Sequence, residues 1–82
     1  MSGFRLVHAS DGERVRIVGL DGGIGAHRKL MDLGLAPGRF VEVVARTPGG
    51  PMLLAVGESR IAVGFGLAMK VRVAAEAEGG GE

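Results

Sequence analysis

The sequence predicts a mainly β fold, a small barrel of five to six strands with one short α-helix. Three observations predict it. Short segments of strand composition recur along the chain, glycine-rich turns separate them, and Gly25 to Gly38 shows helical spacing that ends abruptly. With 82 residues there is room for one domain only. We expect that domain over residues 1–74 and a flexible, acidic, glycine-rich tail over residues 75–82.

The composition favours an aliphatic core and a cytoplasmic protein. Hydrophobic residues make up 46% of the chain but aromatic residues only 4%, with no Trp and no Tyr. Because cysteine is absent, disulfide bonds, thiolate metal sites and a cysteine nucleophile are excluded. No secretory signal and no membrane-spanning run is visible, so we expect a cytoplasmic location.

The net charge of +1 is divided unevenly along the chain. The predicted tail holds three of the nine acidic residues and no basic one, which leaves ten basic groups against six acidic groups in the domain. The domain is therefore mildly basic, short of the dense basic stripe of a dedicated nucleic-acid binder.

The short helix is predicted by spacing and by its stop signal. Ala26, Leu30 and Leu33 lie at i, i+4 and i+7, which places them on one helical face. Gly34 follows the last of them, at the position where a left-handed residue closes a helix without a Cβ clash.

The next residues predict a tight turn and a new strand. Pro37 blocks a return to helix because it fixes φ and lacks an N–H group. Together with Gly38 it suits the central positions of a type II turn. Residues 39–46 then have strand composition, with Val41, Val43 and Ala45 on one face.

The remaining segments complete the predicted barrel. Residues 4–8 read as a short edge strand, and residues 14–19 as a half-buried strand with Val15 and Ile17 inward. Asp21 is a candidate N-terminal cap of the helix. Closure of the sheet is expected, since so small a sheet tolerates open edges poorly. The later predictions are a turn at 47–51, a strand buried on both faces at 52–56, a return strand at 60–63, a helical turn at 64–69 and a last strand at 70–73.

The order of these motifs resembles the FeoA family (ferrous iron transport protein A), small cytoplasmic proteins with an SH3-like β-barrel fold. The resemblance spans roughly residues 6–73, and the run from Leu33 to Gly38 is its most specific part. The matching pieces are Gly12-x-x-Val15-x-Ile17, Leu20-x-Gly22-Gly23, Arg28-x-Leu30-x-x-Leu33-Gly34-Leu35-x-Pro37-Gly38, Val41-x-Val43, Pro48-Gly49-Gly50-Pro51, Val56-Gly57, Ile61-Ala62-Val63, Leu67-Ala68 and Val71-x-Val73.

The resemblance implies a partner rather than a reaction. Members of the family are associated with a membrane ferrous iron transporter that carries a cytoplasmic G domain. The resemblance therefore implies an accessory or regulatory protein that contacts this G domain. A related barrel forms the C-terminal domain of iron-dependent repressors, so a detached regulatory domain that contacts a repressor is an alternative.

The residues themselves predict no enzyme, no metal site and no cofactor. The glycine-rich stretch 19–25 lacks the Lys and Ser/Thr of a phosphate-binding loop. His27 and Asp32 are five residues apart on the helix, about 140° around its axis, and are poorly placed to chelate one ion. His8 would have to reach them across the fold.

The predicted partner-binding residues are Arg28, Met31, Leu35, Pro37 and Phe65, with Gly34 and Gly38 as structural turn residues. An apolar patch with a charged rim is typical of a contact site. The competing interpretation is that Met31 and Leu35 are core residues. Phe65, in a turn that is usually charged in the family, is either tucked inward or an exposed contact.

The residue composition bears on two other binding modes. Polyproline recognition needs several Tyr and Trp rings, and this chain has none. Nucleic-acid binding is the runner-up function, since Arg14, Arg16, Lys70 and Arg72 form outward rows that could contact phosphates. The near absence of stacking rings argues against it.

Overall fold

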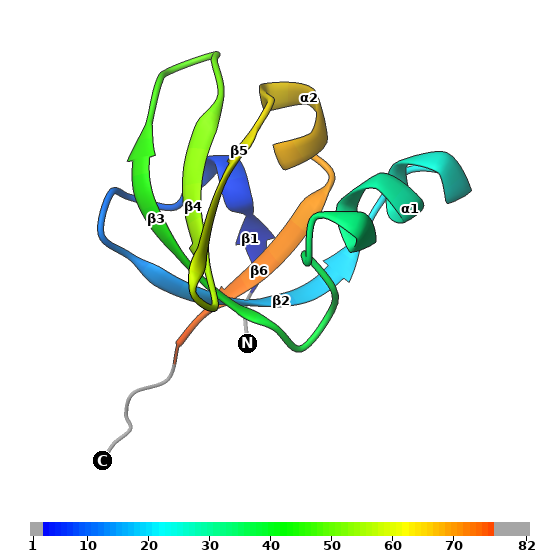
Figure 1. Ribbon diagram of the computed structural model, residues 1–82, viewed down its shortest axis with the longest axis horizontal. Coiled ribbons are helices and arrows are strands. Elements are labelled where there is room, and N and C mark those ends of the chain that lie inside the picture. Colours follow the sequence, from blue (N-terminus) through cyan, green and yellow to red (C-terminus); the bar gives the residue numbers. More distant parts are fainter. Residues whose placement is uncertain (1–2, 77–82) are drawn as a thin grey trace.

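A computed structural model describes residues 3–76 and confirms the mainly β fold (Figure 1). Six strands form one antiparallel sheet in the order β1-β6-β2-β3-β4-β5. The elements are β1 (Phe4–Arg5), the 3₁₀ helix η1 (Leu6–His8), β2 (Arg14–Leu20), α1 (Ile24–Asp32), β3 (Phe40–Arg46), β4 (Met52–Val56), β5 (Ser59–Val63), α2 (Phe65–Ala68) and β6 (Val71–Ala75).

The sheet curls around a single aliphatic core. Alternate residues of β2 and of β6 point inward, as the valine and isoleucine spacing predicts. No aromatic side chain of residues 3–76 is fully buried. The largest fully buried side chains are Leu6, Val15, Ile17, Leu30, Leu35, Val41, Val43, Met52, Leu54, Val63, Val71 and Val73.

The expected closure of the barrel is wrong within the described residues. The sheet begins at β1 and ends at β5, and these two edge strands do not pair. The short helices that follow them, η1 and α2, contact one another instead (Figure 1). Helical packing thus covers part of the opening between the two edges, and the outward edge of β5 keeps its unpaired backbone.

The first apolar segment is a strand only at Phe4–Arg5, because the chain then turns into η1. Leu6 and Val7 are buried by this turn. The guanidinium of Arg46 donates a hydrogen bond of 2.6 Å to the carbonyl oxygen of Val7 and so fixes η1 to the end of β3.

A register shift changes the predicted faces of β3. Val41 and Val43 are buried as predicted, but the β3–β4 register shifts between Val43 and Ala45, and Ala45 is exposed. A bulge moves the next side chain to the other face. In β4 the burial alternates, so the prediction that this strand is buried on both faces is also wrong.

The predicted end of the helix is confirmed in detail. Gly34 has a φ of 89°. Its N–H group bonds to the carbonyl of Met31 at 2.9 Å, and the N–H of Leu35 bonds to the carbonyl of Leu30 at 2.9 Å. This pair of bonds defines a Schellman motif, whose typical apolar contact is supplied here by Leu30 and Leu35, both buried.

The turn after the helix is a type II turn, as predicted. Gly38 has a φ of 92°, and the N–H of Arg39 bonds to the carbonyl of Ala36 at 3.1 Å. The turn is held against β2, because Gly38 donates to the carbonyl of Ile17 at 2.7 Å and Ile17 donates to the carbonyl of Arg39 at 2.8 Å.

Asp21 has a different role from the predicted helix cap. The N-terminal cap of α1 is Gly23, and the Asp21 carboxylate instead pairs with Arg5 and with Arg72, whose Nε lies 3.1 Å away. The hydrogen bond from Arg5, with that from Arg72, holds the pKa of Asp21 below its ordinary value of 3.8. A Cβ atom on Gly19 would overlap the Arg72 guanidinium, so this glycine leaves the space in which Arg72 lies.

The last strand enters the predicted tail. β6 continues to Ala75, which pairs with Val15, and the Glu76 carboxylate lies 3.0 Å from Nε of Arg14. The rest of the predicted tail, residues 77–82, lies outside the described residues.

Candidate partner-binding surface

The exposed side of α1 carries the largest apolar exposure in the described chain. Ile24 is 81% exposed and Met31 is 53% exposed, while Leu30 on the opposite side is buried. Ile24, His27, Arg28 and Met31 follow the spacing i, i+3, i+4 and i+7, which places them on one helical face. With Asp32 they line a shallow hollow of about 390 Å³; these five residues are called the α1 surface.

The position of α1 makes this surface accessible. The helix projects from one side of the sheet (Figure 1). Its inner side is anchored to the core by Leu30 and, less completely, by Leu33. Because so short a helix has only one neighbouring layer, its other side faces solvent.

The α1 surface combines apolar groups with a cation. The Arg28 guanidinium forms no ion pair with a carboxylate among residues 3–76. His27 contributes a buried Nε2 atom with no hydrogen-bond partner in the same range. An apolar centre beside a free guanidinium suits contact with another protein.

The structure brings together only two of the five predicted partner-binding residues. Arg28 and Met31 share the α1 surface. Leu35 is fully buried, so its assignment to a docking surface is wrong; the Schellman motif turns it into the core beside Leu30. Pro37 is exposed in the type II turn.

Phe65 belongs to a different part of the surface. Its side chain is 42% exposed, and with Met69 and Pro48 it lines a separate hollow of about 200 Å³ beside η1 and the β3–β4 turn. Phe65 is thus exposed rather than tucked inward, but it does not extend the apolar patch of α1.

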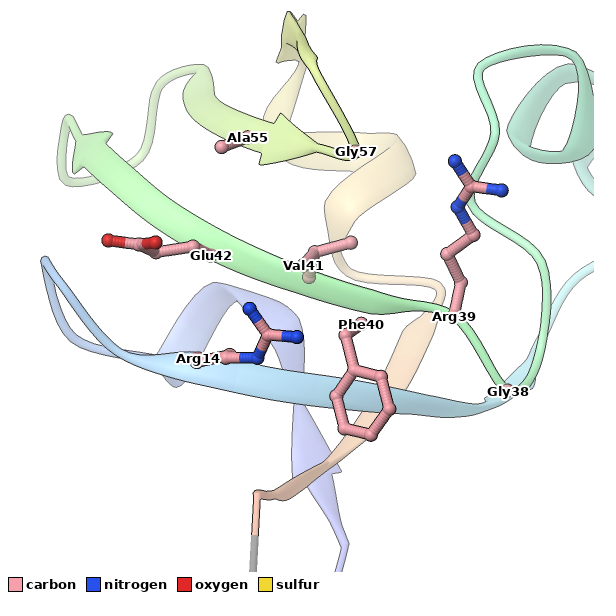
Figure 2. A pocket seen from close by; sticks show the side chains of 8 residues that line it. All are labelled: Arg14, Gly38, Arg39, Phe40, Val41, Glu42, Ala55 and Gly57. Atoms are coloured by element: carbon pink, nitrogen blue, oxygen red, sulfur yellow. The ribbon is translucent and has the colours of Figure 1, made fainter. Parts of the chain in front are cut away.

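A third hollow, of about 400 Å³, lies over β2, β3 and β4 (Figure 2). Arg14 places its guanidinium carbon 5.0 Å from the centre of the Phe40 ring and also pairs with Glu76. Glu42 and Ala55 lie beside it on the next two strands. The charge of Arg14 is therefore already compensated by a ring and a carboxylate.

The described residues offer no ready metal site. Within residues 3–76 no three side chains of His, Asp or Glu lie close enough together to hold a metal ion. In the same part of the chain, none of the helices has the length and apolar character needed to span a membrane.

Sequence reasoning missed Ile24, His27 and Asp32 as members of the surface. The signal was available for Ile24 and His27, because both fall on the helical face of Arg28 and Met31. It was obscured because an exposed isoleucine runs against the usual burial of this residue type.

Comparison with known proteins places this architecture in a family. The profile of the FeoA domain matches residues 4–75. A curated protein of Methanocaldococcus jannaschii, provisionally named Fe(2+) transport protein A, is 39% identical over 79 residues, which cover 96% of this chain and 94% of that protein.

Solved structures of similar proteins support the same family assignment. An iron uptake regulatory protein (FeoA) is 36% identical, with a TM-score of 0.84 over 88% of this chain and 96% of its own. A manganese-dependent transcriptional repressor is 17% identical, with a TM-score of 0.82 over 89% of this chain and 41% of its own, a likeness of fold alone. The mainly β structure is thus the SH3-like fold that the sequence predicted, and the chain belongs to the FeoA domain family.

Proposed function

We propose that this chain is a non-catalytic, cytoplasmic accessory protein of a ferrous iron transport system. It acts by docking the α1 surface on the cytoplasmic G domain of the transporter and so biases that domain between conformations. The observation that carries the proposal is the exposure of Ile24 and Met31 on a helix that is otherwise anchored to the core.

The names of the relatives support the transport part of the proposal. One relative carries the name Fe(2+) transport protein A and another the name iron uptake regulatory protein. A protein of this size that offers an apolar surface, and no cluster of metal-binding side chains in its described part, fits a regulatory contact better than a carrier of iron.

A pull-down with the transporter's cytoplasmic domain tests the contact. We expect Met31→Asp and Arg28→Glu each to weaken binding by roughly tenfold or more, because truncating a central contact residue costs about 1.4 kcal/mol or more. Each nucleotide state of the G domain is tested separately.

Matched variants control for charge and for apolar exposure. Lys29→Glu makes the same charge reversal on an exposed residue of α1 that does not line the hollow. Met69→Asp makes the same apolar-to-acidic change at a residue that is 40% exposed in the Phe65 hollow. Equal loss of binding in Met31→Asp and Met69→Asp would contradict a contact localised to α1.

The nucleic-acid alternative receives little support from the charges. Of the four cations in the predicted outward rows, Arg14 is paired with Glu76 and Arg72 with Asp21. Phosphate contacts would have to displace these carboxylates. Binding of RNA that falls steeply with added salt would revive this alternative.

A further inference from the structure

The free edge of the sheet at β5 is a candidate binding site of a different kind from the α1 surface. β5 pairs with β4 on one side, and no strand of residues 3–76 lies on its other side. It follows β4 through a two-residue turn in which Gly57 has a φ of 61°. Figure 1 shows β5 along the front of the molecule, with β4 on one side of it.

The hairpin geometry identifies the backbone groups that point outward. Val56 and Ser59 flank a two-residue turn and therefore form a hydrogen-bonded pair. The alternation of an antiparallel ladder then directs the N–H and C=O groups of Ile61 and Val63 toward β4. The same groups of Arg60 and Ala62 point away from the sheet, and they have no backbone partner within residues 3–76.

The side chains that lead to this edge form a row in which a cation, a carboxylate and a neutral side chain precede a second cation. On the outer face of the sheet, Arg14 pairs with Glu42, Glu42 with Ala55, and Ala55 with Arg60. Figure 2 shows the first three of these residues on successive strands. The row ends at Arg60, which is exposed and has no ion-pair partner among residues 3–76. A carboxylate in the next position would complement it.

The neighbouring row on the same face is apolar. Ala45 pairs with Leu53, and Leu53 with Ala62. Leu53 is half-buried, while Ala45 and Ala62 are exposed. The next position along this row therefore favours an apolar side chain. On the inner face of the sheet, Ile61 is only half-buried. A partner residue opposite Ile61, between the residues opposite Arg60 and Ala62, would cover the rest of its apolar surface.

We propose that β5 binds an extended segment of a partner protein as a seventh strand, in antiparallel orientation. The segment carries an apolar residue opposite Ala62, an apolar residue opposite Ile61 and an acidic residue opposite Arg60. Hydrogen bonds between the backbone of the segment and the backbone groups of Arg60 and Ala62 supply the binding energy, and the guanidinium of Arg60 selects the acidic residue. This site does not depend on the α1 contact.

A second copy of this chain fits the edge less well. A second copy paired in antiparallel orientation would bring another Arg60 to the edge, and no carboxylate of its strand β5 to face Arg60.

The test uses a capped synthetic peptide with Val-Val-Glu at its centre and a control peptide with Val-Val-Lys. Amide exchange and chemical shifts of the ¹⁵N-labelled full chain are followed as each peptide is added. We expect slowed exchange at the amides of Arg60 and Ala62, with the acidic peptide binding about three- to tenfold more tightly. Sedimentation shows whether a second copy occupies the edge instead.

Variants of the protein make the result decisive. Arg60→Glu reverses the preference so that the lysine peptide binds more tightly, whereas Arg16→Glu, an equal change on an exposed residue of a central strand, keeps the original preference. Ala62→Pro removes one outward N–H group and abolishes protection, while Ala62→Val retains it. The proposal would be overturned if amide exchange at Arg60 and Ala62 were unchanged at millimolar peptide. It would also be overturned if both peptides bound equally, or if a dimer of the protein excluded the peptides.

Discussion

The left-handed residue that ends α1 allows a test in which one substitution has opposite effects at two nearby positions. At Gly34 the φ of 89° is unfavourable for any residue with a Cβ atom. The nearest neighbour of an added Cβ would be a methyl of Val56 at 3.6 Å, an ordinary contact. The cost of Gly34→Ala is therefore backbone strain alone, about 1–2 kcal/mol.

At Gly25 the same substitution should stabilise the protein. Gly25 is the second residue of α1, is exposed, and has open space where a Cβ would be placed. Alanine is favoured over glycine in a helix by up to about 0.5–1 kcal/mol, the value for interior positions. The two variants are thus expected to differ by about 2 kcal/mol in unfolding free energy.

Urea denaturation followed by circular dichroism measures both changes. In a domain of this size 1 kcal/mol corresponds to a shift of about 4–8 °C in Tm, so thermal melts provide a second measurement. Gly34→Asn should recover part of the loss, because asparagine tolerates the left-handed region. If Gly34→Ala were as stable as the wild type, or if asparagine and alanine behaved alike, the assignment of the cost to backbone strain would be refuted.

Three further predictions concern the core and the Asp21 ion pairs. Leu35→Ala should cost about 2–5 kcal/mol in urea denaturation, as expected for a buried leucine and unlike a surface contact. Gly19→Ala should lower the free energy of unfolding only slightly, because it displaces Arg72 from an exposed ion pair with Asp21, and a double-mutant cycle should show no such loss in an Arg72→Ala background. Because the pKa of Asp21 is lowered in the folded state, the contribution of its carboxylate to stability is fully present above pH 3.8 and is lost as the pH falls through the folded pKa. Asp21→Asn should remove this pH-dependent loss of stability. Denaturation at a series of acidic pH values measures it.

Features governed by local chemistry were predictable from the sequence. The end of α1 at Gly34 and the type II turn at Pro37 and Gly38 follow from the conformations that these residues adopt whatever surrounds them. The inward direction of Val15 and Ile17 follows equally from strand alternation. These local signals place the strands along the chain, whereas the SH3-like fold was implied by the resemblance to the FeoA family.

Features governed by distant partners were not predictable in the same way. The bulge that exposes Ala45 depends on how β3 pairs with β4, and the opening of the barrel depends on how η1 meets α2. Leu35 was assigned to the surface because its position just after a helix gives no sign of which way the chain turns. The bonds of the Schellman motif turn it inward.

Two of the five residues of the α1 surface were predicted from the sequence. Arg28 and Met31 were identified, and helical spacing could have added Ile24. Phe65 was expected in the same patch, but the hollow that it lines is built from η1 and the β3–β4 turn. Sequence alone does not show which segments α2 will approach.

The pairing of β2 with β6 has a consequence for how the protein is made. Val15 pairs with Ala75 and Leu20 with Val71, so the centre of the sheet joins the beginning of the chain to its last strand. β3, β4 and β5 are neighbours in both sequence and space and can form early. During synthesis on the ribosome, β2 therefore has no partner on one side until β6 has emerged. We expect nascent chains that end before Val71 to hold a β3–β4–β5 meander without a completed core.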